Sequence, residues 1–211
     1  MKIALINGSP KGWDSASRHL LEILHENLLD AHAFEYTWNR PNSGKKDFEE
    51  VIKCDAIVFA FPLYIDTIPS HLLNNLVSFE EYIKNTSLSQ IIRVYVIVNN
   101  GFFDAKQNHV AIDNIGHWCR RSGVIMAQGV GIGGGGMILG IEKVPSDKGP
   151  KKNIGNAMMV LAGNILEERG GEKMLILPNL PAFAYKIVAE MTWRKMAKGN
   201  GLTTKDLYRK I

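Results

Sequence analysis

The sequence is poor in cysteine and has no long hydrophobic run, and each shortage narrows the class of protein. Its 211 residues include two cysteines, Cys54 and Cys119, which lie far apart and match no metal-binding or CxxC spacing. They argue against an iron–sulfur cluster built from this chain alone, and they fit a reducing compartment. No stretch approaches the eighteen or so apolar residues of a membrane-spanning helix, and the N-terminal apolar run is too short for a signal peptide. We therefore expect a cytoplasmic protein with no membrane partner and no metal site.

Charge is present in an ordinary amount and is only slightly unbalanced. There are 25 basic and 21 acidic residues, giving a net charge of +4, and 45% of the residues are hydrophobic. Outside the C-terminal region the basic residues are scattered among acids, and the aromatic residues do not interleave with a basic stripe, so we expect no nucleic-acid partner. The length predicts a single domain over residues 1–211, with a core of about 1–170 and a C-terminal helical extension of about 171–211.

Short apolar, β-branched-rich runs alternate with helical patterns along the chain. The expected strands are residues 2–7, 33–38, 55–61, 91–98 and 124–130. The expected helices are residues 15–29, 44–53, 69–84, 105–122, 153–169 and 182–198. Alternation of this kind predicts an α/β fold with a doubly wound, five-stranded parallel sheet. Runs three and four are almost wholly apolar, which is typical of strands buried on both faces, whereas the second alternates like an edge strand.

The loop after the first strand has the composition of a phosphate-binding loop. It runs from Gly8 to Ser17 and leads directly into a helix, whose first N–H groups and partial positive charge attract anions. Ser9, Ser15 and Ser17 add hydroxyl donors. A tight turn with a serine cap is the alternative. The loop lacks the GxxxxGK[ST] pattern of a phosphoryl-transfer P-loop.

Two later loops should meet the first one, because ligands of doubly wound sheets bind at the carboxyl ends of the strands. The segment from Phe61 to Ser70 is largely apolar between Pro62 and Pro69, and it offers main-chain groups and the Tyr64 ring. The turn from Asn99 to Asp104 offers two further aromatic rings and, we expect, backbone N–H groups of residues 100–103 facing a ligand. The alternatives are a loop packed on its own domain and a helix-capping turn.

Two other patterns are less informative. Residues 129–134 match GxGxxG, but they follow the fifth run, and the next helix is expected only after Pro150, so a dinucleotide fingerprint is not supported. We expect Gly133 to Gly136 to make a close approach or a mobile loop near the site, with a flexible turn as the alternative. His109 and His117 share one helix face without further ligands nearby, which favours ordinary helix residues over a metal site.

Together, a phosphate cradle at one end and a slot of peptide groups and aromatic rings at the other suit flavin mononucleotide. The Gly-Ser-Pro-Lys-x4-Ser-x-Ser start, the Pro-Leu-Tyr-Ile-Asp-x-Ile-Pro loop and the Asn-Asn-Gly-Phe-Phe turn resemble the flavodoxin-like NAD(P)H-dependent FMN reductase family along about the first 140 residues. The resemblance implies a flavodoxin fold, non-covalent FMN and a homodimer.

The resemblance also assigns residues. The phosphate group would be held by Ser9, Ser15, Ala16 and Ser17, with Lys11 where many members have Arg. Ala16 departs from the Asn found in many members, so one side-chain donor is lost. The ribityl chain and ring would be flanked by two sets, Pro62, Leu63, Tyr64 and Ile65, and Asn99, Asn100, Gly101 and Phe102.

The function implied is an oxidoreductase that takes hydride from NAD(P)H and passes electrons to a small-molecule acceptor such as a quinone, flavin, or nitro or azo compound. No side chain is assigned as general acid, although Tyr64 is a candidate. A flavodoxin-type electron carrier is the alternative, although carriers tend to be strongly acidic and this chain is basic. A flavin-free interaction module is a third possibility.

Overall fold

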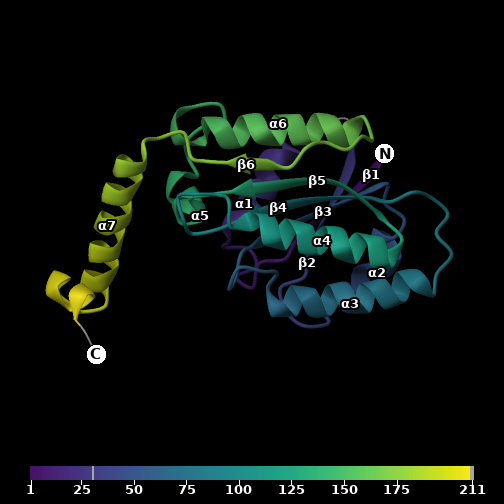
Figure 1. Ribbon diagram of the computed structural model, residues 1–211, viewed down its shortest axis with the longest axis horizontal. Helices are drawn as coiled ribbons and strands as arrows, with labels where there is room; N and C mark the ends of the chain where they lie inside the picture. Colours follow the sequence, from purple (N-terminus) through teal and green to yellow (C-terminus); the bar gives the residue numbers. More distant parts are fainter. Residues whose placement is uncertain (30, 210–211) are drawn as a thin grey trace. The chain divides into compact units, whose positions relative to one another are not determined.

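The computed structural model describes residues 1–29 and 31–209 and forms two compact units, Met1–Pro178 and Asn179–Ile211. The larger unit contains a sheet of parallel strands with helices on both faces (Figure 1). Its strands are β1 (Lys2–Asn7), β2 (His32–Thr37), β3 (Ala56–Pro62), β4 (Arg93–Asn99), β5 (Ile125–Ile132) and β6 (Met174–Ile176). Every neighbouring pair in the order β2-β1-β3-β4-β5-β6 is parallel, and β2 lies at one edge as its alternating pattern predicts.

The predicted count of five strands is wrong, because the sheet has six. The extra strand, β6, lies in the region expected to be a helical extension. It has only three residues, too few for a period-two pattern, and it pairs only with the carboxyl half of β5, from Val130 to Ile132. Pairing with β5, rather than a hydrophobic pattern in its own sequence, therefore makes β6 a strand.

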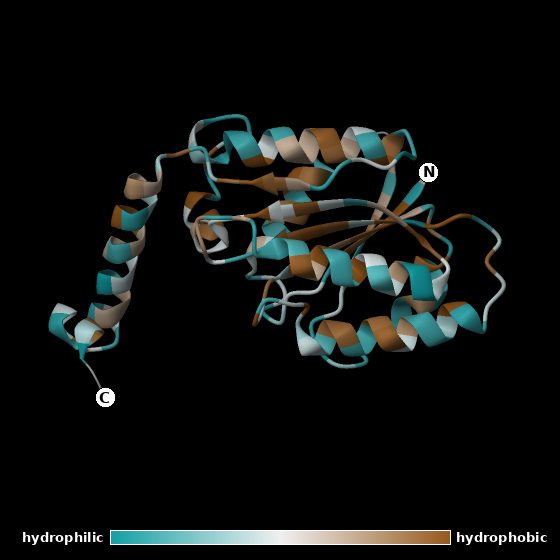
Figure 2. Ribbon diagram, viewed as in Figure 1, coloured by the Kyte–Doolittle hydropathy of each residue, from teal (hydrophilic) through white to brown (hydrophobic). Residues whose placement is uncertain are grey.

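The helices divide between the two faces of the sheet. One face packs against α1 (Ala16–His25) and α6 (Lys152–Leu166), and the other against α2 (Phe48–Val51), α3 (Ser70–Lys84) and α4 (Asn108–Ser122). Figure 2 shows largely hydrophobic strands between helices in which hydrophilic and hydrophobic residues alternate. Leu20 and Leu24, four residues apart on one face of α1, are fully buried, as expected of an amphipathic helix packed on a sheet.

Two local predictions differ from the structure. The helix expected over residues 44–53 is divided into a 3-10 turn, Lys45–Asp47, and the single turn α2. A helix also begins earlier than expected after the fifth strand, since α5 (Gly135–Ile138) and a 3-10 turn (Leu139–Ile141) precede Pro150. Glycine has low helix propensity, so α5 could not be expected from its local sequence.

The C-terminal unit consists of α7 (Ala182–Gly199) and a 3-10 turn (Thr204–Tyr208) with a Thr203–Asp206 capping box. Within α7 only Ala197 is buried, while apolar side chains such as Phe183, Met191 and Trp193 are exposed. Seven basic and two acidic residues of the sequence fall in this unit, so it carries a net +5 and the larger unit −1. Across the described residues, no helix is both long and apolar enough to cross a bilayer.

Candidate functional site

The three predicted loops meet at the carboxyl edge of the sheet, and Asn99 joins them. In the parallel register, Asn99 at the end of β4 lies opposite Pro62 at the end of β3. Its side-chain Oδ1 accepts a hydrogen bond from Ser17 Oγ at 2.8 Å, and its main-chain oxygen accepts one from Leu63 N at 2.8 Å. One buried residue of a central strand therefore fixes the first loop and the second loop relative to each other.

The first loop is shaped by Asn7, the last residue of β1, which is buried. Its Nδ2 donates to the main-chain oxygen of Gly12 at 2.8 Å, and its Oδ1 accepts from Ser9 N at 3.0 Å. Gly12 has a positive φ of 61°, which favours glycine. The loop is thus held in one shape by a side chain beneath it.

The serine hydroxyls of this loop make hydrogen bonds inside the protein. Ser15 caps α1, accepting from Arg18 N at 3.2 Å and donating to Gly12 O at 2.7 Å, and Ser17 donates to Asn99. Both residues are almost fully buried. Because the first N–H groups of a helix have no acceptor within it, main-chain donors of Ala16 and Ser17 are the groups that this helix end offers to an anion.

The second loop forms a tight hairpin in the left-handed region. Tyr64 and Thr67 exchange two main-chain hydrogen bonds of 3.1 Å, and the two residues between them, Ile65 and Asp66, have φ values of 48° and 56°. A β-branched residue rarely adopts such a φ, which costs about 1–2 kcal/mol. Ile65 is 98% exposed, so no packing of its side chain offsets this cost. Strain of this kind concentrates at functional sites.

The third loop is organised by Asn100. Its Oδ1 accepts from Phe102 N at 3.0 Å and its Nδ2 donates to Asp104 O at 3.0 Å, while its own N–H donates to Ile132 O. The expectation that the N–H groups of residues 100–103 face a ligand is therefore wrong for Asn100 and Phe102. The Phe102 side chain is 59% exposed, and a Cβ added to Gly101 would meet no atom within 4 Å.

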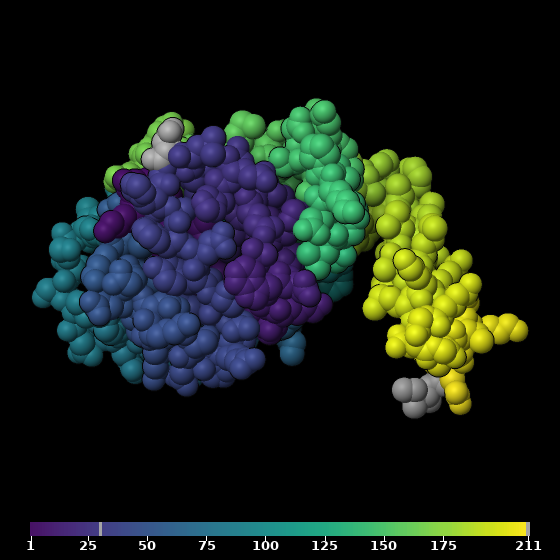
Figure 3. All heavy atoms as spheres, turned by 180° about the vertical axis from the view of Figure 1, so that it is seen from behind, coloured from purple at the N-terminus to yellow at the C-terminus, as the bar shows by residue number. Residues whose placement is uncertain are grey.

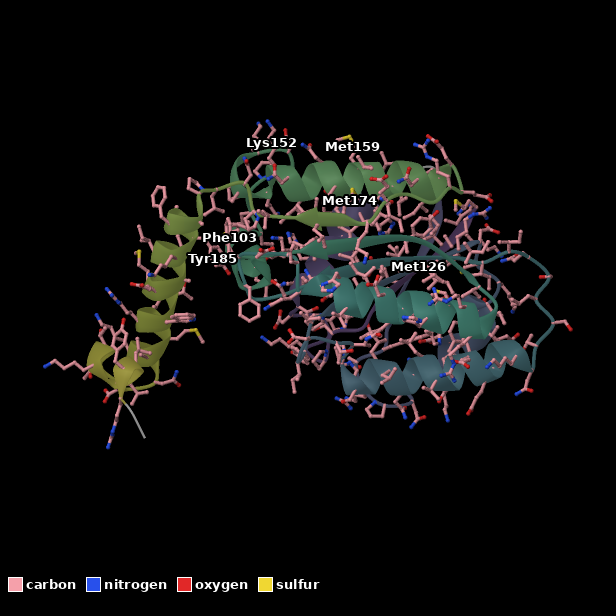
Figure 4. The ribbon with its side chains drawn as sticks, viewed as in Figure 1. Phe103, Met126, Lys152, Met159, Met174 and Tyr185 are labelled. Atoms are coloured by element: carbon pink, nitrogen blue, oxygen red, sulfur yellow. The ribbon has the colours of Figure 1, made fainter. Side chains whose placement is uncertain are left out.

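The glycine-rich segment after β5 packs directly against this third loop. A Cβ on Gly133 would stand 2.1 Å from the carbonyl oxygen of Phe103, the residue labelled beside α5 in Figure 4. A Cβ on Gly135 would stand 2.7 Å from the oxygen of Asn100, which accepts a hydrogen bond from Gly135 N at 2.6 Å. The predicted close approach is confirmed at Gly133 and Gly135, but not at Gly136, where an added Cβ would meet no atom within 4 Å.

One residue of this region was missed by sequence reasoning. His71, in the first turn of α3, places Nε2 3.0 Å from the main-chain oxygen of Gly8, so that Nε2–H donates to the first loop. The only sequence signal was its position just after Pro69, at the start of the helix that follows the second loop.

Several other features of the larger unit lie apart from the three loops. A cavity of about 410 Å³ lies between α4 and β5 and is lined by His117, Arg120 and Lys173 among others, but by none of the predicted site residues. His109 Nδ1 lies 2.7 Å from Lys106 O, as expected of an ordinary helix residue. In the described ranges, no group of three or more metal-ligating side chains comes together.

The cysteines belong to the core. Both are free and buried among the apolar side chains beneath α2, α3 and α4. Burial raises the pKa of Cys119 to about 12 and that of Cys54 to about 11. Thiols with such pKa values remain protonated and unreactive at neutral pH, so we assign them no role at the carboxyl edge of the sheet.

Comparisons with known proteins give the class of the fold. No family model and no curated protein matches the sequence. Among solved structures, an NAD(P)H:quinone oxidoreductase from Methanothermobacter marburgensis is similar, with a TM-score of 0.58, 15% identity, and coverage of 78% of this chain and 96% of that one. A flavodoxin from Streptococcus pneumonia TIGR4 has a TM-score of 0.54 at 12% identity, covering 80% and 99%.

A third similar structure is an FMN-dependent NADH-azoreductase from Bacillus anthracis str. Ames Ancestor, solved in complex with FMN. Its TM-score is 0.50 at 16% identity, covering 76% of this chain and 99% of that one. The chain therefore has a flavodoxin-like fold, as the sequence resemblance implied. This fold serves both reductases and flavodoxins, so it does not by itself assign an activity.

Proposed function

We propose that this chain binds FMN at the carboxyl edge of its sheet and uses it to pass electrons from NAD(P)H to a small acceptor such as a quinone, flavin, or nitro or azo compound. The observation that carries the proposal is the meeting of the three loops at Asn99, at the edge where doubly wound sheets bind ligands. Two features of this edge, the main-chain donors at the start of α1 and the exposed side chain of Phe102, fit the two ends of this cofactor.

In this proposal the phosphate group lies over the first loop. Ala16 and Ser17 would donate their N–H groups, Lys11 would add charge, and the buried hydroxyls of Ser9 and Ser15 would keep the loop in shape. The loss of a side-chain donor at Ala16 is tolerable because the main-chain donor remains.

The ring would lie between the second and third loops. Pro62, Leu63, Tyr64 and Ile65 form one wall, and the other is formed by Asn99, Asn100, Gly101 and Phe102. The bound cofactor would supply the redox chemistry by accepting hydride and releasing electrons. The chain would orient the ring and leave one of its faces open for the electron donor and the acceptor in turn. The open space beside Gly101 leaves room for these molecules.

A flavodoxin-type electron carrier is the second candidate, because a flavodoxin is among the similar structures. The basic net charge counted against it, but that charge lies in the C-terminal unit, and the larger unit is nearly neutral. Charge therefore does not decide between the two. Anaerobic stopped-flow mixing of the purified yellow protein with NADH or NADPH does, because prompt bleaching of flavin absorbance supports the reductase and no bleaching supports the carrier.

Binding itself is tested at Ala16. An Ala16→Glu substitution places a carboxylate at the first helical position, where the helix dipole favours it but a phosphate group would be repelled. We expect FMN affinity to fall at least about tenfold, because the carboxylate and the phosphate group repel each other. Thermal stability should be kept or raised, because a carboxylate at this helix end is favourable. Ala16→Gln, of equal size, is the control. Equal FMN affinity of the two variants would contradict the assignment.

We also propose a homodimer in a reducing, cytoplasmic compartment. The exposed apolar side chains on α7 support the first part, because surfaces of this kind are commonly buried between protein chains. The two buried free thiols support the second. Light scattering on the eluted protein measures the oligomeric state, and a monomer at all concentrations would contradict the dimer.

A further inference from the structure

Lys151 is a buried lysine without a carboxylate partner. It lies at the start of α6, is 2% exposed, and donates from Nζ to the main-chain oxygen of Glu142 at 2.9 Å. An ammonium group has three donors, and no other acceptor and no carboxylate within ion-pair distance is found for it in the described part of the chain. A buried charge in this condition is costly unless another group pairs with it.

This lysine lines a cavity of about 320 Å³ between α1 and the loop that follows α5. Figure 3 shows the green segment that follows α5 lying beside the purple N-terminal residues. His19 and Ile23 lie four residues apart on one face of α1, and Glu26 caps the end of this helix; the three residues form one wall. The volume is within the range of small-molecule sites.

A second residue that lines the cavity also carries an unpartnered polar atom. His19 Nδ1 lies 3.1 Å from Glu22 Oε2, and since a carboxylate only accepts, Nδ1 carries the proton. The other ring nitrogen, Nε2, is buried and has no hydrogen-bond partner among the described residues. Two residues that line the cavity, Lys151 and His19, therefore carry polar atoms whose hydrogen-bonding capacity is not fully used among the described residues.

The rim of the cavity has the opposite charge to its buried lysine. The exposed carboxylates of Glu26, Glu142 and Asp147 line it, against the single exposed ammonium of Lys143. Burial lowers the pKa of Lys151, while the charges of Glu26 and Glu142 act against this and favour the ammonium form. A simple anion would meet Lys151 only after passing these carboxylates, whereas a molecule with both charges would find a partner for each.

We propose that this cavity is a binding site for a small zwitterion of amino-acid size, with its anionic group on Lys151 and its protonated amine among the rim carboxylates. The site shares α1 with the proposed flavin site but none of its residues. It is therefore independent of the proposed function, and its test requires no FMN and no turnover.

The test is ligand-observed NMR on the full-length protein with matched probes. The zwitterions are β-alanine, γ-aminobutyrate and ε-aminohexanoate, which separate the two charges by increasing lengths, and the single-charge controls are propionate and propylamine. We expect at least one zwitterion to bind with a Kd of about 1 mM or tighter, and at least about tenfold more tightly than either control.

Variants then locate the site. Lys151→Met should abolish zwitterion binding, whereas Lys152→Met, which removes the exposed neighbouring lysine that projects from α6 in Figure 4, should not change it. If Lys151→Met fails to fold, Glu26→Gln at the exposed rim should weaken binding of the zwitterion and should leave propionate binding as strong as before or stronger, because one repelling carboxylate is removed. Failure of all three zwitterions to bind, equal binding of propionate, or full binding by Lys151→Met or Glu26→Gln would overturn the proposal.

Discussion

Replacing Gly133 by alanine tests whether the glycine-rich segment holds the third loop in place. The added Cβ would stand 2.1 Å from the carbonyl oxygen of Phe103, and it would also come within 3.2 Å of Ala105 N. Both neighbours are main chain, so no side-chain rotation relieves the overlap, and the two segments must separate by about 1 Å to reach ordinary contact distance.

The size of the effect follows from that displacement. Overpacking of a well-packed region costs about 1–3 kcal/mol, and we expect the upper part of this range because two backbones must move. A shift of about 1 Å at the Asn100–Phe103 turn should also weaken FMN binding, by about tenfold or more if the ring lies there. Urea unfolding followed by circular dichroism measures the first effect, and flavin fluorescence titration measures the second.

Gly136→Ala is the matched control. It lies in α5 three residues further on, is exposed, and its added Cβ would meet no atom within 4 Å. Alanine favours a helix over glycine by up to about 1 kcal/mol, so this variant should be as stable as the parent protein or more so. If both variants unfold and bind FMN alike, the close approach does not hold the loop and the reasoning fails.

Three further predictions concern a buried hydrogen bond, a strained turn and a buried thiol. Ser17→Ala and Asn99→Ala should couple by about 1 kcal/mol in a double-mutant cycle of urea unfolding, because they share one buried hydrogen bond, and additive effects would contradict that bond. Ile65→Gly should raise the free energy of unfolding by about 1 kcal/mol by relieving the left-handed strain, and a loss of stability would show that the turn is not strained. Burial raises the pKa of Cys119 from 9.0 to about 12, so between these pH values the folded state keeps a proton that the unfolded state loses. The free energy of unfolding should therefore fall as the pH rises from 9.0 to about 12, by up to about 1.4 kcal/mol per pH unit. Cys119→Ala should flatten this fall in unfolding experiments at alkaline pH, and an unchanged slope would exclude the thiol as its cause.

Much of the larger unit could be predicted because its central strands are buried on both faces. Such strands are continuous apolar runs, and residues 55–61 and 91–98 were placed within two residues of β3 and β4. By contrast, β6 is three residues long and α5 is a single turn rich in glycine, so both depend on contacts with distant parts of the chain rather than on local pattern.

The site was predictable in position and less so in detail. Loop composition and the topology of parallel sheets were enough to bring the three loops to one edge. The direction of the serine hydroxyls was not predictable, because the bond from Ser17 to Asn99 joins residues 82 positions apart. The contact of His71 with Gly8 is equally long-range, spanning 63 positions.

The position of Asn99 in a central strand limits how the carboxyl edge of the sheet can move. Because β4 is paired on both sides, the amide that anchors the loops can shift only if the middle of the sheet opens, which is among the least frequent fluctuations of a folded protein. The carboxyl edge around Asn99 is therefore pre-organised, and a ligand that bound there would lose little free energy to ordering the chain. Movements that let a ligand enter or leave would then involve residues that Asn99 does not hold in place, namely Ile65 at the tip of the second loop and the Phe102 ring.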